Sequence, residues 1–282
     1  MKRVRRRTRD WTMVVGLIIA VLALVSAVLA PWLAPSNPYE QTDVLATRFL
    51  PPFSTGPDGV THWFGTDRFG RDVLSRLLYG AQISLTVGLL SVAISTLLGL
   101  GVGISAAVFG GRLDRILMAV TDAALALPRL VLLLALVAIF NPSLWLVVVV
   151  LGCTGWMPVA RLSRAEIRSM LSRPFVVAAR GYGLSTWRLI TRHLLPNTLT
   201  PVLVAGALAV GNAITLESGL AFLGLGVPPP APSWGSMIAG GRDALVFAPW
   251  IAVFPGVAIA MMVLACNLIG DGLRDWLDPQ SR

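Results

Sequence analysis

Apolar runs long enough to cross a lipid bilayer dominate this sequence. Residues 11–33 are almost wholly apolar, and comparable runs follow at residues 81–109 and 245–269. A helix needs about 20 apolar residues to span the hydrocarbon core, where every backbone polar group must be bonded within the protein. A charged fraction of 13% and a mean hydropathy of +0.75 exclude an ordinary soluble domain. The sequence therefore predicts an all-α, polytopic membrane protein.

The apolar runs and the positions of the arginines predict six transmembrane helices, with both termini in the cytoplasm. The expected spans are residues 11–33, 81–109, 116–140, 144–160, 201–225 and 245–269. Cytoplasmic segments of membrane proteins carry an excess of Lys and Arg. Of the 23 Lys and Arg residues, the segments expected outside hold only Arg48, Arg68, Arg71, Arg76 and Arg242. The chain is thus expected to be a multi-pass protein of the plasma membrane.

The first span has two interpretations, because a basic segment at residues 1–10 precedes it. A basic start followed by an apolar run is typical of a cleaved signal peptide. This run is long enough to span a bilayer, and no clear pattern of small residues for cleavage stands before Pro31. We interpret it as a retained anchor.

A basic segment at residues 161–201 is the longest polar stretch in the second half of the chain. It contains one acidic residue, Glu166. Its arginines are Arg161, Arg164, Arg168, Arg173, Arg180, Arg188 and Arg192. One interpretation is a solvated loop that only fixes the topology. The other, which we favour, is a docking surface for a cytosolic partner.

The same segment predicts two helices joined by a glycine turn. Ser172 is expected to cap the first helix, with Pro174 in its first turn. Gly181 and Gly183 are expected to end it, and Ser185 to cap the second helix. The second helix is expected to have an apolar face formed by Trp187, Ile190 and Leu194. It is expected to stop or kink at Pro196.

These residues carry a resemblance to a known family. Ala178, Ala179 and Gly183 form an AAxxxG motif that, with the later Leu195-Pro196, resembles the EAA loop of ABC importer permeases. The stretches HWFGTDRFGRDVLSRLLYGAQISL (residues 62–85) and ESGLAFLGLGVPPPAPSWGSMI (residues 217–238) are similar to the C-type subunit of the peptide/nickel permease subfamily. The sequence departs from the family at two loop positions, where Val177 replaces a glutamate and His193 an isoleucine.

The resemblance implies a fold, a set of partners and a mechanism. Residues 80–271 would form the type-1 permease domain, residues 1–79 a basic tail, a first span and an extracytoplasmic segment, and residues 272–282 a cytoplasmic tail. The implied partners are a second related permease, two ATPase chains that bind ATP and Mg, an extracytoplasmic substrate-binding protein and membrane lipid. The protein would import short peptides by alternating access, with nickel or a nickel chelate as the alternative. The residues expected to couple the spans to the ATPase are Val177, Ala178, Ala179, Arg180, Gly183, Leu195 and Pro196.

Several chemistries are excluded or disfavoured for this chain itself. A P-loop needs a Gly-Lys pair, and the only lysine is Lys2, so ATP is expected on other chains. No Ser/His/Asp set or HExxH motif occurs, so no catalytic residue is assigned. The net charge of +9 does not indicate nucleic acid, because the arginines lie in short segments between apolar spans. No metal site is predicted, since the two histidines are expected on opposite sides of the membrane and both cysteines lie in apolar spans.

Polar residues within the spans are the candidates for a translocation path. These are Asp122, Asn212 and Glu217, although Glu217 could instead support the start of a neighbouring helix. Arg129 is expected to snorkel from the first turns of its span, with residues 113–122 along the inner interface. A secondary transporter working alone would need such charges as coupling groups, and no inverted repeat supports it. A membrane scaffold with the basic loop as its docking site is a third possibility.

Two further patterns concern local structure. Gly99 and Gly103 form a GxxxG step, which permits close helix contact or gives only packing flexibility. The outer segment at residues 31–79 contains Asp67 and Arg71 in a GTD…GRD pattern, for which we expect a structured turn with internal Asp–Arg pairs. Its last residues, 72–79, are expected to form an amphipathic helix at the membrane interface.

Overall fold

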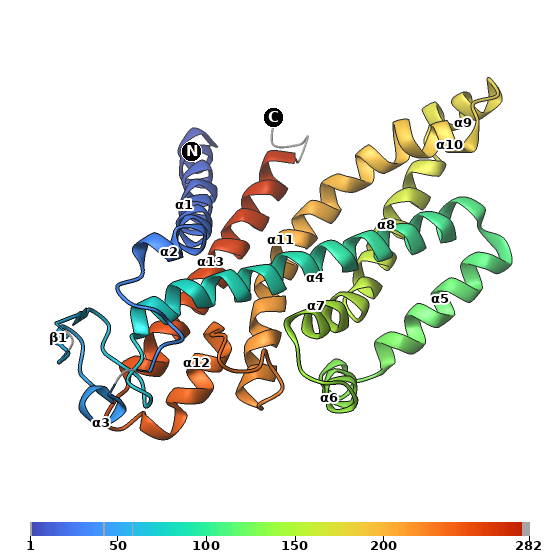
Figure 1. The fold of residues 1–282 in the computed structure, drawn as a ribbon. Coiled ribbons are helices and arrows are strands. Elements are labelled where there is room, and N and C mark those ends of the chain that lie inside the picture. Colours follow the sequence, from blue (N-terminus) through green and yellow to red (C-terminus); the bar gives the residue numbers. More distant parts are fainter. Residues whose placement is uncertain (1, 42, 58, 278–282) are drawn as a thin grey trace.

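The computed structural model describes residues 2–41, 43–57 and 59–277 as a bundle of tilted helices (Figure 1). In this described part, five helices are long and apolar enough to cross a membrane, or six if one strongly bent pair is a single span. The predicted all-α polytopic architecture is confirmed. The elements are α1 (Lys2–Val28), α2 (Ala30–Leu33), α3 (Val44–Thr47), β1 (Ser54–Thr55), β2 (Thr61–His62), α4 (Val73–Phe109), α5 (Gly111–Ala126), α6 (Arg129–Ile139), α7 (Leu144–Cys153), α8 (Trp156–Leu171), α9 (Pro174–Gly181), α10 (Thr186–Leu189), a π-helical turn (Ile190–Leu194), α11 (Leu195–Phe222), α12 (Trp234–Gly241), a 3-10 turn (Arg242–Ala244) and α13 (Trp250–Leu277).

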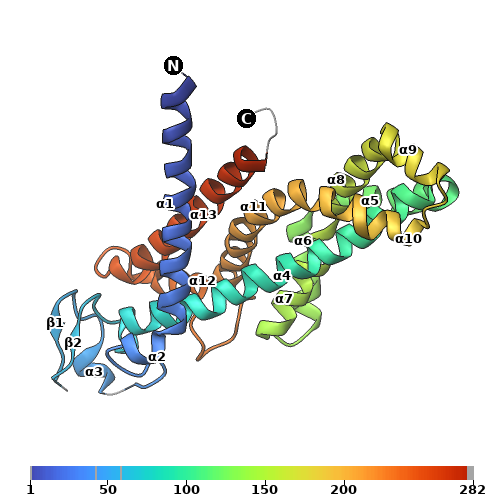
Figure 2. The same cartoon turned by 90° about the horizontal axis from the view of Figure 1, so that it is seen from above.

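The core lies where α1, α4, α11, α12 and α13 meet. Helix α1 runs beside α13 in both views (Figures 1 and 2), and a Cβ added at Gly16 would lie only 2.8 Å from the Cβ of Leu268. Small residues allow such close approach of helix backbones. The buried side chains of this core are Ala27, Ala81, Leu85, Val210, Ile214, Trp234, Met262 and Cys266.

Helix α4 is the long element that connects the two ends of the molecule. Its 37 residues extend roughly 55 Å, which exceeds the ~30 Å hydrocarbon core. The helix begins at Val73, and the Asp72 side chain caps it by accepting a hydrogen bond from the Ser75 N–H at 2.7 Å. The amphipathic helix expected at residues 72–79 is therefore not a separate element, because no residue interrupts the backbone pattern before the span.

The GxxxG step on α4 is a site of close helix contact. A Cβ added at Gly99 would lie 2.5 Å from the Val159 Cβ, and one added at Gly103 would lie 2.6 Å from the Ala160 carbonyl oxygen of α8. Gly101, between them, has no neighbouring atom within 4 Å. The interpretation as close contact is thus confirmed over plain flexibility, and α4 and α8 meet nearly backbone to backbone.

The third apolar run forms two helices that meet at 84°. Helix α5 begins at Gly111, directly after Gly110, whose φ of 62° favours glycine. The chain therefore reverses at the glycine pair and is helical again at once. The bend falls at Leu127 and Pro128, because proline disfavours a helical conformation in the residue before it.

The fourth run is also broken, between α7 and α8. Arg129, at the start of α6, donates to the Leu151 carbonyl oxygen at 3.2 Å and lies 3.5 Å from the Thr154 hydroxyl. The last carbonyls of a helix lack intrahelical partners and carry partial negative charge, so a guanidinium stabilises them. The expectation that Arg129 snorkels away is wrong, because the α7 terminus supplies acceptors within reach.

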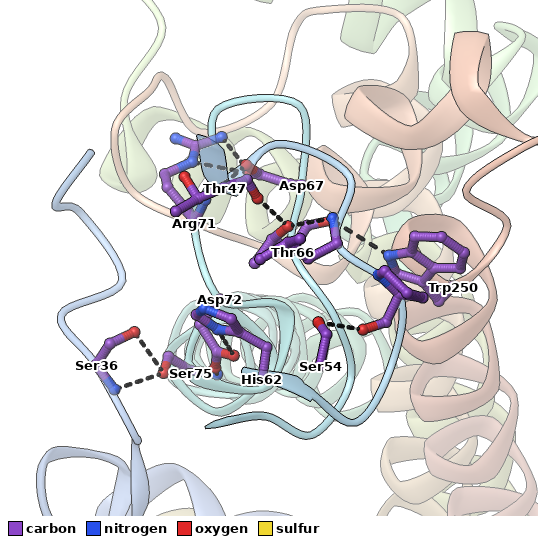
Figure 3. A network of polar contacts seen from close by, with 12 residues as sticks. Ser36, Thr47, Ser54, His62, Thr66, Asp67, Arg71, Asp72, Ser75 and Trp250 are labelled. Atoms are coloured by element: carbon purple, nitrogen blue, oxygen red, sulfur yellow. Dashed lines mark hydrogen bonds and ion pairs between the residues drawn. The ribbon is translucent and has the colours of Figure 1, made fainter. Parts of the chain in front are cut away.

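The outer segment before α4 is a structured network, as expected (Figure 3). Asp67 accepts hydrogen bonds from the Arg71 side chain at 2.8 Å and is paired with it at 2.7 Å, which confirms the internal Asp–Arg pair. His62 of β2 lies 2.9 Å from the Asp72 carboxylate. The Trp250 indole of α13 donates to the Thr66 carbonyl oxygen at 3.2 Å and so attaches the segment to the bundle.

The segment after α11 contains a short helix that the sequence did not predict. Residues 223–233 are not helical, because their glycines and prolines interrupt a helix, but α12 follows and begins in a capping box at Ser233. The last span begins at Trp250 rather than residue 245 and continues as helix to Leu277. The first part of the expected tail at residues 272–282 is therefore helical, and residues 278–282 lie outside the described residues, as does Met1 of the basic N-terminal segment.

Both described ends of the chain point to the same side of the bundle as α9 and α10 (Figure 1). The outer segment with β1 and α3 lies on the opposite side, together with α12. This arrangement places the arginine-rich segment and the N-terminal helix on one side.

Candidate functional site

The segment from α8 to α11 forms the most exposed end of the bundle. Much of the basic stretch is helical, because α8 continues to Leu171, and Ser172 ends α8 rather than capping α9. The predicted Ser172 cap is wrong by one position: Arg173 precedes Pro174, which is the first residue of α9. The predicted cap of the second helix is confirmed, since the Ser185 hydroxyl accepts a hydrogen bond from the Arg188 N–H.

The inner face of α9 and α10 is anchored to the ends of α4 and α8. Val176, Leu189 and Leu194 are fully or almost fully buried and pack with Ile167 and Met170 of α8. A fully buried side chain of this size contributes ~1.5–3 kcal/mol. The predicted apolar face was incomplete, because Trp187 is 73% exposed while Leu189 takes its buried place. These buried contacts attach the loop to the ends of α4 and α8.

The outer face of the same helices is exposed and carries large apolar side chains beside Arg173, Arg180 and Arg188. Val177 is 57% exposed and Tyr182 is 93% exposed, and Phe175 also projects from the segment. Exposed large apolar groups gathered on one surface are typical of an interaction site. Of the residues predicted for coupling, Val177, Ala178, Arg180, Gly183 and Pro196 are exposed, and Ala179 and Leu195 are half-buried.

The turn between α9 and α10 has the expected form. Tyr182 N–H donates to the Ala178 carbonyl at 3.0 Å, and Gly183 N–H donates to the Arg180 carbonyl at 2.9 Å. Gly183 has a φ of 78°, a region that favours glycine because it has no Cβ. The helical structure does not stop at Pro196, however. A π-helical turn joins α10 to α11, and Pro196 occupies the first turn of α11.

An ion-pair cluster that the sequence analysis did not find joins α5 to α8. Asp114 accepts from Arg164 at 2.5 Å and 2.8 Å and from Arg168 at 2.7 Å, and its side chain is only 7% exposed. Asp122 pairs with Arg161 at 2.5 Å on the more exposed part of the same helix pair. The sequence signal for this cluster was the helical spacing of Arg161, Arg164 and Arg168, which places them on one face of a helix. Three of the arginines assigned to the basic loop thus hold two helices together.

The three residues proposed for the translocation path do not form one group. Asn212 lines a hollow of about 320 Å³, and Ser91, Ser95 and Arg129 line it as well. Asp122 is paired with Arg161, as described above, and does not line this hollow.

Glu217 is fully buried beneath α12. The Ser84 hydroxyl is 3.5 Å from the Glu217 Oε2 atom and accepts a hydrogen bond from the Trp234 N–H at 3.1 Å. The carboxylate thus supports the first turn of α12 through Ser84. This contact favours the helix-start alternative over a place on the path.

The described residues contain no group of three or more His, Cys, Asp or Glu side chains that could hold a metal ion. Cys153 is exposed and Cys266 is buried, and they are not bonded to each other. The features with functional geometry are therefore the exposed α9–α10 surface and the hollow beside Asn212.

The comparisons with known proteins identify the family. Residues 99–282 match the family described as binding-protein-dependent transport system inner membrane component. The chain belongs to this family of ABC importer permeases. Residues 2–52 of the permease also match the N-terminal transmembrane domain of oligopeptide transport permease C. The expected family and the location in the inner membrane as a multi-pass protein are thereby confirmed.

Curated relatives cover almost the whole permease. A putative peptide transport system permease protein of Brucella abortus is 44% identical over 98% of this chain and 90% of its own length. A di/tripeptide transport system permease protein of Pseudomonas aeruginosa is 42% identical over 94% and 87%, respectively. A dipeptide transport system permease protein of Alkalihalophilus pseudofirmus is 38% identical over 95% and 86%.

A solved structure supports the fold of the permease. The MetNI methionine ABC transporter, in inward-facing conformations, matches with a TM-score of 0.56 and 20% identity, over 69% of this chain and 93% of that chain. Membership in an ABC importer family implies partner chains that hydrolyse ATP and that bind substrate outside the membrane.

Proposed function

We propose that this permease is the C-type membrane subunit of an ABC importer for short peptides. The complex contains a second related permease, two ATPase chains that hold ATP and Mg, and an extracytoplasmic substrate-binding protein. The observation that carries the proposal is the anchored α9–α10 segment, with one face fixed to α4 and α8 and the other exposing large apolar side chains beside arginines. Such a segment can act as a rigid connection, because its buried contacts pass a movement of the outer face directly to α4 and α8.

The orientation in the membrane follows from charge. The arginine-rich α8–α10 region and the basic N-terminal helix face the cytoplasm, and the segment at residues 31–72 faces outward. Closure of the ATPase dimer on ATP moves the turn from Ala178 to Gly183, and α8 and α11 carry this movement to the hollow beside Asn212. The hollow then opens outward and accepts substrate from the binding protein. Apolar contact by Val177 takes the place of the polar contact made by the family glutamate.

Short peptides are the substrate that the relatives support. Three relatives with 38–44% identity are described as peptide, dipeptide or di/tripeptide permeases. The hollow is lined mainly by apolar side chains with a few hydroxyl, amide and guanidinium groups, which suits a varied peptide better than a bare metal ion. Nickel or a nickel chelate is the second candidate, because residues 62–85 and 217–238 resemble a peptide/nickel subfamily.

Uptake by cells that lack this gene distinguishes the two substrates. Uptake of labelled di- to pentapeptides is expected to fall to the background level and to return when the gene is restored. Nickel uptake is expected to stay unchanged, which also serves as a control for membrane integrity. Lost nickel uptake with unchanged peptide uptake would contradict the peptide assignment and favour the metal.

A further inference from the structure

A polar pocket of about 220 Å³ lies at the outer end of the bundle, away from α9 and α10. One wall is the outer segment and the first turn of α4, which contribute Asp67 and three arginines. The other wall is the proline-rich segment at residues 229–231 with the adjoining face of α12. The pocket therefore opens between a charged stretch and a proline-rich stretch, beside the first turns of α4 and α13.

The charges that line this pocket do not balance. Arg68, Arg71 and Arg76 all line it, and among the residues that the structure describes Asp67 is the one acidic side chain in the lining. Asp67 is saturated by local partners, since it accepts from the Arg71 side chain and from the backbone N–H groups of Phe69 and Arg71. It also lies 3.6 Å from the Arg76 Nε atom. One carboxylate is thus shared by the guanidinium groups of Arg71 and Arg76, and the charge of Arg68 adds to theirs.

The excess positive charge is held in place and partly removed from water. The side chains of Arg71 and Arg76 are only 10% and 8% exposed, and the guanidinium groups of Arg68 and Arg71 each lie 4.6 Å from the Phe69 ring centre. Stacking on an aromatic ring fixes the planar fork and leaves its N–H groups directed sideways. Burying unbalanced charge is costly unless an opposite charge approaches. The pocket is therefore complementary to a carboxylate, which a guanidinium binds in a bidentate manner.

We propose that this pocket receives an acidic side chain of the extracytoplasmic substrate-binding protein when it docks. The inference rests on the proposed function, which supplies that partner and places this end of the bundle outside. The pocket walls are the outer segment and the loop before α12, which are surfaces that a docking protein meets first. A phosphate from a lipid headgroup shares the anionic chemistry and is the alternative that the experiment must separate.

The test measures ATP hydrolysis by the complete complex while the substrate-loaded binding protein is titrated. Arg68→Gln removes an exposed charge that stacks on the Phe69 ring, and the fold is expected to be retained. It is expected to raise the binding-protein concentration for half-maximal stimulation about 5- to 10-fold, without changing the basal rate or the maximal rate. Arg48→Gln is the matched control, because Arg48 is an exposed arginine of the same segment that does not line the pocket. It is expected to leave the midpoint unchanged.

A second variant adds the missing charge rather than removing one. Gln41 lines the pocket, and Gln41→Glu places a carboxylate beside the arginines. This variant is expected to melt at a higher temperature than the unmodified complex and yet to need more binding protein for half-maximal stimulation. Higher salt is expected to raise the midpoint of the unmodified complex more than that of Arg68→Gln, because screening weakens charge pairs.

Three results would contradict the inference. One is an equal midpoint for Arg68→Gln, Gln41→Glu and the unmodified complex. Another is an equal shift in Arg48→Gln, which would indicate only a general effect of surface charge. The third is a thermal stabilisation by anionic lipid vesicles that Arg68→Gln abolishes without any change in midpoint, which would assign the pocket to a lipid headgroup. Failure of the binding protein to stimulate even the unmodified complex would contradict the proposed function itself, and the inference with it.

Discussion

Replacing Gly103 with leucine is expected to prevent the folded permease from accumulating in the membrane. The Cβ alone would lie 2.6 Å from the Ala160 carbonyl oxygen and would also meet the Ser163 hydroxyl. Both atoms belong to α8, whose backbone cannot shift without moving the α9–α10 segment anchored to it. Overpacking a tight contact typically costs ~1–3 kcal/mol, and a clash with backbone lies at the upper end of that range or beyond.

The matched control for this prediction is Gly101→Leu. Gly101 belongs to the same helix but is exposed and has no atom within 4 Å of an added Cβ. The measurement is the amount of monodisperse permease after detergent extraction, together with its melting temperature. Gly103→Leu is expected to lose most of the extractable protein and Gly101→Leu very little. Equal amounts of the two variants would show that α4 and α8 do not meet at this glycine.

Replacing Asp114 with asparagine is expected to separate the first turns of α5 from the last turns of α8. The asparagine keeps the shape of the side chain but removes the charge that Arg164 and Arg168 share. Breaking a buried ion pair costs roughly 3–5 kcal/mol. The side chains of Arg164 and Arg168 are 27% and 49% exposed, so water compensates part of the loss and we expect about 2 kcal/mol.

The control for Asp114→Asn is Asp122→Asn on the same helix. Asp122 and Arg161 are 57% and 54% exposed, and exposed pairs contribute only ~0–1 kcal/mol. A lower melting temperature of the purified complex is expected for Asp114→Asn and almost no change for Asp122→Asn. Protease sensitivity near Gly110 is expected to rise only in the first variant. Equal melting temperatures would contradict the assignment of Asp114 as the main link between these helices.

The features that the sequence predicts correctly depend on local chemistry. Long apolar runs predict spans, because a helix hydrogen-bonds its own backbone N–H and C=O groups, as the lipid interior requires. Gly183 predicts the turn after α9, and Ser185 predicts a helix start, because each acts on its own backbone. The pair between Asp67 and Arg71 also lies within one turn of chain.

The features that the sequence does not predict depend on contacts between distant residues or on very short elements. Asp114 and Arg164 are 50 positions apart, and nothing in either local sequence shows that α5 and α8 lie side by side. Arg129 turns toward α7 only because that helix ends beside it. Helix α12 has 8 residues, which is too few for a hydrophobic period to be evident after a proline-rich stretch.

We infer that the exposed α9–α10 surface couples ATP hydrolysis on partner chains to peptide transport. The most direct measurement reconstitutes the complete complex in lipid vesicles and records ATP hydrolysis and labelled peptide uptake together. Ala178→Trp and Gly183→Val alter exposed positions of the turn, and Gly181→Ala is the control because Gly181 is exposed in helical backbone. Both turn variants are expected to assemble but to lose most of the stimulation by the substrate-loaded binding protein and the peptide uptake that accompanies it. Unmodified stimulation and uptake in both variants, with the complex intact, would contradict the account.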